Sequence, residues 1–174
     1  MADSSAGAGA DTTGGAQQQT AVPNIAIRAQ YVKDLSFENP SAPQILSGSA
    51  ERPKIDINVG IRTARLSETD FEVELQINAK ADISDKPAFI VELKYAGVFA
   101  LTNFPQEQLQ PIVMIECPRL LFPFARQIIA SSTRDGGFPP LMLEPIDFVA
   151  LYRRQQQEAA TRQAQASDQP AGSA

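Results

Sequence analysis

Apolar and polar residues alternate along several stretches in the first two-thirds of the chain. This period of two predicts β-strands, because successive side chains on a strand point to opposite faces. In residues 54–66 the apolar face consists of Ile55, Ile57, Val59 and Ile61. Residues 71–80 repeat the pattern, with an apolar face of Phe71, Val73, Leu75, Ile77 and Ala79. The polar segment 67–70 separates the two stretches, so we expect an antiparallel hairpin.

Two further stretches are also predicted to be strands. Residues 25–38 begin with alternating apolar positions and change phase near Val32, which indicates a β-bulge or a bend there. Residues 89–101, which follow a turn at 84–87, are apolar on both faces apart from Glu92 and Lys94. A strand of this kind is typical of a sheet position that is covered on both sides.

The apolar period changes to that of a helix in the last third of the chain. Residues 105–116 have helical spacing, and Pro111 either starts this helix or kinks it. A second helix is expected within residues 117–137, with Pro123 in its first turn and Gly136 at its end.

A last helix should begin at Asp147, with its apolar side ending near Arg154. Strands followed by helices predict an α+β fold, with a four-stranded antiparallel sheet and helices on one side. The apolar stretch 89–101 and the Ile- and Val-rich helix 105–116 carry more apolar surface than one layer of helices readily covers. We therefore expect the chains to associate, although long loops are an alternative cover.

Composition places the folded part between two tails. Residues 1–21 and 157–174 contain no aliphatic side chain larger than alanine beyond Met1, so we expect a disordered N-terminal tail and a flexible C-terminal tail. Residues 22–156 then form one domain. The chain shows neither a secretory signal pattern nor an apolar run long enough to insert into a membrane, which favours a cytoplasmic location.

Charge and residue usage argue against most enzyme chemistry. The chain has no histidine, which excludes Ser-His-Asp triads, Cys-His dyads and His-ligated metals. The single cysteine, Cys117, cannot form an internal disulfide, and a buried apolar role suits it better than a reactive one. We expect no catalytic residues, no metal and no cofactor. The net charge is −5, of which residues 22–156 carry only −2, so nucleic acid is not an expected partner.

Three separated segments resemble the SecB family of protein-export chaperones: residues 31–40, 117–126 and 137–152. The resemblance covers about residues 24–153. It implies a homotetramer, assembled as a dimer of dimers, in which a crossover loop at about residues 39–52 joins the first two strands. It also implies an ATP-independent holdase of the bacterial cytoplasm, which keeps unfolded precursor proteins competent for translocation and passes them to the SecA motor.

The resemblance places a client-binding groove between the crossover loop and the long helix. A holdase must accept many unfolded chains, so extended apolar surface suits it better than a fixed pocket. The groove candidates are Phe37, Ile45, Leu46, Phe122, Phe124, Phe138, Leu141 and Leu143. The alternative for each of them is an ordinary place in the core, where large apolar residues usually lie. The family often has tryptophan in the crossover loop, and this chain has none.

The resemblance also implies a SecA-binding surface on the sheet, formed by Asp34, Glu38, Ile90 and Glu92. Its partner is the basic, zinc-binding C-terminal segment of SecA. Period-two spacing puts Ile90 and Glu92 on the same face of their strand. It also puts Asp34 and Glu38 on the same face of theirs, if the backbone between them stays extended. The alternative is that these carboxylates mark only a solvated sheet face.

Two other functions compete with the chaperone. A carrier of a lipid or small apolar ligand would hold it in a closed cavity between sheet and helices. A hydrolase that uses only carboxylates comes third, since two acids alone suit few reactions beyond glycoside cleavage, and the chain has no tryptophan to form a sugar platform.

Overall fold

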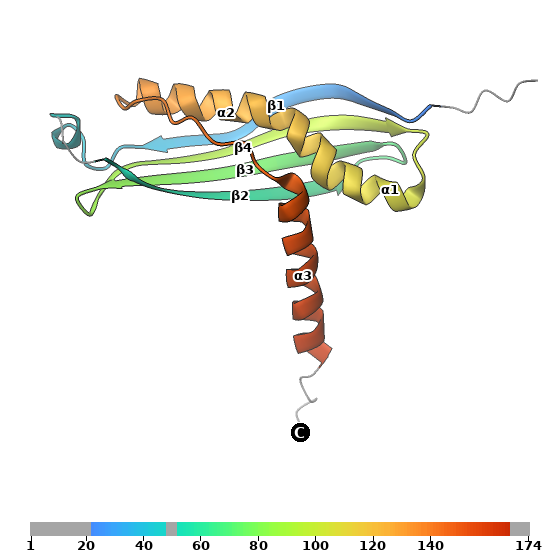
Figure 1. Cartoon of the computed structure of the whole chain (residues 1–174). Helices are drawn as coiled ribbons and strands as arrows, with labels where there is room; N and C mark the ends of the chain where they lie inside the picture. Colours follow the sequence, from blue (N-terminus) through green and yellow to red (C-terminus); the bar gives the residue numbers. More distant parts are fainter. Residues whose placement is uncertain (1–21, 48–51, 168–174) are drawn as a thin grey trace, which may run out of the picture.

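A computed structural model describes residues 22–47 and 52–167. Four strands form one antiparallel sheet in the order β1-β4-β3-β2 (Figure 1). The strands are β1 (Asn24–Glu38), β2 (Lys54–Arg65), β3 (Asp70–Ile83) and β4 (Lys86–Thr102). The predicted tail at residues 1–21 and part of the crossover loop lie outside the described residues. The rest of that loop contains the short 3-10 helix η1 (Gln44–Ser47).

The predicted hairpin of β2 and β3 is confirmed, with Ile57 opposite Ala79 and Ile61 opposite Leu75 in the ladder. The predicted bulge in β1 is also confirmed as a register shift between Val32 and Asp34. A second register shift, which the apolar pattern did not predict, lies near Arg28. Each bulge adds one residue to β1. The side chains that follow a bulge therefore change faces relative to strict alternation.

The helices follow the sheet along the chain. They are α1 (Gln106–Pro111), a π-helical turn η2 (Ile112–Glu116), α2 (Cys117–Asp135) and α3 (Phe148–Ser167). Helical backbone continues from α1 through η2 into α2, because the flanking residues Ile112 and Cys117 are themselves helical. The π-turn begins directly after Pro111, which has no N–H to donate and whose ring crowds the preceding turn. Pro111 was expected either to start this helix or to kink it. The structure shows that it interrupts the regular helix and does not start it.

One prediction for α2 was wrong. Pro123 lies inside the helix rather than in its first turn, because α2 begins at Cys117 and its first-turn proline is Pro118. The end of the helix is as predicted: the Gly136 N–H donates to the Ser132 carbonyl at 2.9 Å, and Gly137 follows with φ of +90°.

The core lies between the inner face of the sheet and α2, which packs on β4 and β3 (Figure 1). Leu121 and Ile129 of α2 are fully buried against sheet residues such as Leu75 and Leu93. Burying each side chain of this size contributes about 1.5–3 kcal/mol. Cys117 belongs to the same core cluster, as the sequence predicted.

The apolar face of β2 is only partly covered. Ile61 is buried, whereas Ile55 and Ile57 are 39% and 43% exposed, although all of them share the predicted inner face. The helices lie over β3 and β4, so the start of this edge strand extends beyond them.

The second half of β4 is buried on both sides, as expected, and the cover on its outer face comes from neighbouring strands. The outer face of its second half consists of Ala96, Val98 and Ala100, of which both alanines are buried. The Tyr31 hydroxyl of β1 hydrogen-bonds to Glu72 of β3 and so spans these small residues. Long side chains from the two neighbouring strands therefore shield β4 without a further layer.

Helix α3 begins as predicted and ends later. The Asp147 carboxylate accepts a hydrogen bond from the Ala150 N–H at 2.9 Å, and Phe148 is buried against Phe122 in an edge-to-face contact. The helix continues to Ser167, so residues 157–167 of the predicted C-terminal tail are helical, and residues 168–174 lie outside the described residues. It projects away from the sheet in Figure 1. No helix in the described part of the chain is long and apolar enough to cross a membrane.

Candidate functional site

An apolar groove opens at the end of the sheet where β2 begins and β4 begins. Its volume is about 330 Å³, and its walls come from η1, the strand ends and the loop after α2. The lining residues are Ile45, Leu46, Pro53, Ile55, Ile83, Ala88, Phe89, Gly137, Phe138, Pro139, Pro140 and Leu141. Apolar side chains and proline rings dominate this list. The groove is therefore suited to apolar segments and offers few groups for specific polar recognition.

Phe89 lines this groove and is buried, with 3% of its surface exposed. Its ring packs on Phe138 with 5.0 Å between ring centroids, and it stacks on Phe37 at 5.9 Å. Phe37 in turn lies against Gly136 at the end of α2, so closely that a Cβ on this glycine would be 2.2 Å from the ring. Three aromatic rings from β1, β4 and the loop after α2 thus form one continuous layer.

The crossover loop is fastened to the end of α2 by contacts at two adjacent glycines. The Asn39 side-chain amide donates a hydrogen bond to the Gly136 carbonyl at 3.3 Å. Leu46 packs on Gly137, where a Cβ would come within 3.2 Å of the leucine side chain. The positive φ of Gly137 also favours glycine over any other residue.

A buried threonine anchors the loop after α2, which forms one wall of the groove. Thr133 is fully buried in α2, and its hydroxyl accepts a hydrogen bond from the Leu141 N–H at 2.9 Å. The same hydroxyl is 3.1 Å from the Ile129 carbonyl, to which it donates. The segment that carries Phe138 and Leu141 is therefore attached to the helix by an internal hydrogen bond.

The predicted groove residues fall into three places. Ile45, Leu46, Phe138 and Leu141 line the groove, and Phe37 lies directly behind Phe89. Phe122 and Leu143 are buried in the core, with 8% and 2% of their surface exposed. Phe124 is 51% exposed on another part of α2, where it stacks on Tyr95.

Sequence reasoning missed several lining residues, of which Phe89 is the most important. It was predicted only as part of an apolar strand. The alternation of residues 89–101 places Phe89 on the same face as Val91, next to the turn at 84–87. This end-of-strand position was the available signal, because a side chain there lies near loops rather than under the middle of a helix.

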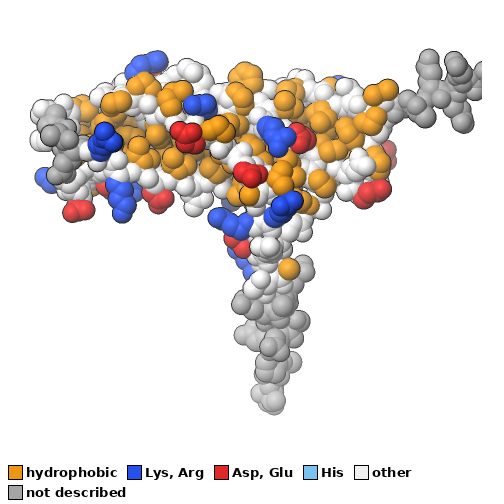
Figure 2. All heavy atoms as spheres, viewed as in Figure 1, with side chains coloured by type: hydrophobic (Ala, Val, Ile, Leu, Met, Phe, Trp, Pro, Cys, Tyr) orange, Lys and Arg blue, Asp and Glu red, His pale blue; other side chains and the backbone are white. Residues whose placement is uncertain are grey.

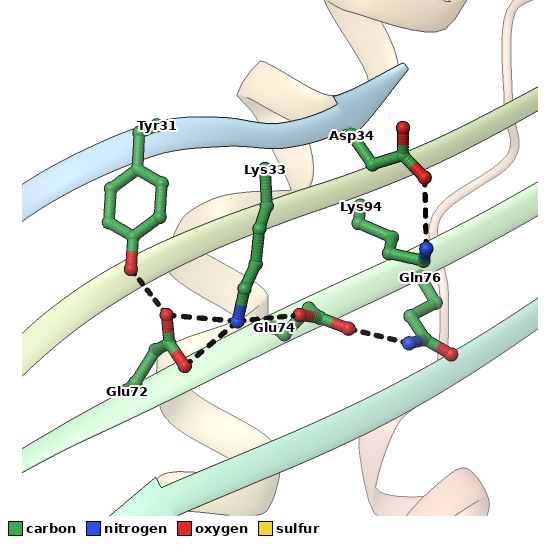
Figure 3. A network of polar contacts seen from close by, with 7 residues as sticks. All are labelled: Tyr31, Lys33, Asp34, Glu72, Glu74, Gln76 and Lys94. Carbon is green, nitrogen blue, oxygen red and sulfur yellow. Dashed lines mark hydrogen bonds and ion pairs between the residues drawn. The ribbon is translucent and has the colours of Figure 1, made fainter. Parts of the chain in front are cut away.

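The outer face of the sheet carries a network of charged side chains (Figure 3). The Lys33 ammonium lies 3.0 Å from the carboxylates of both Glu72 and Glu74. Hydrogen bonding from Tyr31, followed by Lys33, holds the pKa of Glu72 below its usual range. Burial raises the pKa of Glu74, but the Gln76 amide and Lys33 lower it more, so the net shift is downward.

All the residues predicted to bind SecA lie on this outer face. Glu38 is directly opposite Ile90 in the β1–β4 ladder, and Glu92 is two positions further along the same face of β4. Asp34 lies opposite Lys94 and forms an ion pair with it, with 2.9 Å between Nζ and Oδ2. Glu38 and Glu92 form no ion pair with any residue in the described ranges 22–47 and 52–167.

An apolar groove beside the sheet, with ordered charges on the opposite face of the sheet, suits a protein that binds other chains through extended surfaces. The sequence matches the family model "Preprotein translocase subunit SecB" over residues 17–159. The chain belongs to the SecB family of protein-export chaperones.

Individual relatives agree with this assignment. The chain is 55% identical to the protein-export protein SecB of Afipia carboxidovorans, over 89% of this chain and 96% of that protein. It is 52% identical to the SecB of Parvibaculum lavamentivorans, over 91% of this chain and 94% of the relative. Among solved structures, the SecB-like chaperone Rv1957 of Mycobacterium tuberculosis, in complex with a ChAD peptide from the HigA1 antitoxin, has a TM-score of 0.58 at 16% identity. That alignment covers 71% of this chain and 91% of the other.

Proposed function

We propose that the chain is an ATP-independent holdase of the cytoplasm that binds unfolded precursor proteins, keeps them competent for translocation and delivers them to SecA. The observation that carries the proposal is the apolar groove around Phe89 in a chain of the SecB family. A protein of the same fold is known in complex with a peptide, which supports polypeptide binding by this architecture. Binding of this kind requires neither nucleotide hydrolysis nor a catalytic group.

The apolar surface continues beyond the groove. Ile55 lines the groove and Ile57 follows it on the same face of β2, where both are more than a third exposed. An extended segment that enters the groove can therefore continue along the uncovered start of this edge strand. Each apolar side chain that a client buries contributes up to about 1.5–3 kcal/mol, so several weak contacts add to useful affinity without a fixed sequence.

Suppression of aggregation tests the groove. We expect the protein to suppress light scattering by a refolding precursor without nucleotide, and Leu46→Glu to reduce this suppression because it puts a charge on the groove wall. Leu66→Glu is the matched control, since Leu66 is 57% exposed near the turn after β2, away from the groove. Equal suppression by both variants would contradict the groove assignment.

We also propose that the chain forms a homotetramer, arranged as a dimer of dimers. Strand β1 is an edge of the sheet, and Ile27, Val32 and Leu35 on its inner side are 43–47% exposed. Leu120 and Phe124 of α2 add exposed apolar surface. Figure 2 shows hydrophobic side chains along the length of the body in this view, interspersed with charged ones. Such surface favours association of chains.

Native mass spectrometry tests the assembly and the rival function together. The chaperone proposal predicts a tetramer without a retained small molecule. A smaller species that retains a defined lipid or apolar ligand would instead support the carrier.

For delivery to SecA, we propose that Asp34, Glu38, Ile90 and Glu92 receive its basic zinc-binding C-terminal segment. Ile90 is next to Glu38 and Glu92, neither of which forms an ion pair within residues 22–47 and 52–167. Such a surface suits a cationic partner, which gains orientation and association rate from the charges. We expect Glu92→Lys to weaken SecA binding while leaving suppression of aggregation and the oligomeric mass intact. An unchanged affinity for SecA would contradict this assignment.

A further inference from the structure

Basic side chains of the protein itself already occupy several carboxylates on the outer face of the sheet. Arg28 pairs with Asp70 at 3.0 Å, Lys33 bridges Glu72 and Glu74, and Lys94 pairs with Asp34. A cationic partner that docks here meets two kinds of carboxylate. Some are already paired with a lysine or arginine of this protein, and others are not. Glu38 and Glu92 are of the second kind among the described residues.

Lys94 is the internal cation closest to the proposed docking surface. It stands opposite Asp34 on β1 and opposite Gln76 on β3, and Glu92 lies two positions away on the same strand face. A hydrogen bond from Lys94 to Asp34 raises the pKa of the lysine, and the charges of Glu74 and Glu92 raise it further. The ammonium therefore lies in an acidic environment of which Asp34 is its main partner.

The Lys94–Asp34 pair is open to exchange. The two side chains are 46% and 55% exposed, so water and external cations reach both of them. Lys33 is different, because it bridges two carboxylates whose side chains are only 19% and 9% exposed. An exposed pair of single charges is weak, whereas a partly buried bridge is harder to replace.

We propose that Lys94 competes with the basic partner for Asp34. The partner binds this face by displacing the Lys94 ammonium from that carboxylate. The inference rests on the proposed docking of SecA and adds a residue that sets its affinity. In the free protein Lys94 neutralises Asp34 and leaves Glu38 and Glu92 as the open acids. A partner whose charges reach only those two gains nothing at Asp34, whereas a partner with a third suitably placed cation takes the place of Lys94. Lys94 thereby makes docking weaker and more selective.

Two substitutions at Lys94 change the competitor in opposite directions. Lys94→Gln keeps the stem and removes the charge, so the partner no longer has to displace a cation. We expect it to tighten binding about two- to five-fold, the range that exposed ion pairs support. Lys94→Arg keeps the charge but offers a planar fork that pairs with a carboxylate in two places, so it should weaken binding about two-fold.

Binding is measured by fluorescence anisotropy, with the zinc-loaded C-terminal segment of SecA as a labelled peptide and the full-length chain as receptor. Lys54→Gln, on the opposite edge strand β2, changes the net charge as Lys94→Gln does and is the matched control. The expected order of affinity is Lys94→Gln above the unsubstituted protein, and Lys94→Arg below it. Equal gains from Lys94→Gln and Lys54→Gln would overturn the inference, because net charge alone would then explain them. Lys94→Arg with unchanged affinity would overturn it as well.

Glu92→Gln separates this inference from the proposal on which it rests. If Glu92→Gln weakens binding and the Lys94 variants follow the expected order, both stand. If Glu92→Gln weakens binding but the Lys94 variants do not differ from the control, docking on this face stands and the competitor is refuted. If Glu92→Gln binds the peptide unchanged, the docking surface itself is wrong and the inference falls with it.

Discussion

The contact between Gly136 and Phe37 allows a quantitative prediction for Gly136→Ala. The backbone of Gly136 has φ of −75° and ψ of 0°, which alanine adopts without strain, so any loss of stability must come from the added methyl group. That Cβ would lie 2.2 Å and 2.3 Å from two ring carbons of Phe37, and the ring must leave its stack on Phe89. Overpacking of this kind costs about 1–3 kcal/mol, and the stiffer unfolded chain returns about 0.4–1 kcal/mol. We expect a net loss of about 1–2 kcal/mol.

Urea unfolding at a fixed protein concentration measures this loss, since association makes apparent stability depend on concentration. Gly60→Ala is the matched control, because a Cβ there would make ordinary contacts with Gln76 at 3.6 Å and 3.8 Å. Phe37→Leu should restore part of the stability in the Gly136→Ala background by giving the methyl group room. The reasoning is refuted if Gly136→Ala unfolds at the same urea concentration as Gly60→Ala. Suppression of aggregation should fall with Gly136→Ala, because Phe37 supports Phe89 in the groove.

Further predictions concern buried and charged groups. Thr133→Val should lower the free energy of unfolding by about 1–3 kcal/mol in urea titrations, because the Leu141 N–H loses its acceptor. Burial raises the pKa of Cys117 to about 12, so a thiol reagent at pH 8 should label the native protein over about 100-fold more slowly than the urea-unfolded chain. The pKa of Glu72 lies below its usual 4.5, so its contribution to stability is full above that pH and is lost as the pH falls through the folded-state value. Tyr31→Phe removes the main cause of the lowered Glu72 pKa. The thermal unfolding midpoint of this variant should therefore fall less between pH 5 and pH 3 than that of the unsubstituted protein.

The strands were predictable because their signal is local and periodic. Residues 55–61 and 71–79 alternate so regularly that a one-residue slip would turn one apolar face outward, and in the ladder both apolar faces lie on the same side of the sheet. The start of the last helix was predictable for a similar reason, since Asp147 accepts a hydrogen bond from within its own first turn. Such features depend on neighbours a few residues away in the chain.

The features that the alternating pattern did not predict depend on contacts between elements that are far apart in the sequence. Ile57 and Ile61 have the same pattern, yet Ile57 is 43% exposed and Ile61 is buried, because α2 packs on β3 and β4 rather than along all of β2. Ala96 is covered by side chains from two other strands, which no pattern within residues 89–101 describes. The groove was predictable only in part, since half of its candidates line it and Phe89 joins it through contacts with β1 and with the loop after α2. The four predicted SecA-binding residues do share one face, and their role stays a prediction.

The groove wall contains Pro53, Pro139 and Pro140, and their chemistry affects what the groove can distinguish. A proline nitrogen carries no hydrogen, so these positions cannot donate to the main chain of a bound segment. Strand direction and register are normally read through such donors, so the part of the wall formed by these three prolines favours neither orientation of the incoming chain. The proline rings also have little conformational freedom to lose on contact. We therefore expect this wall to accept segments in either direction and to let them slide, so that a client can be released stepwise from the groove.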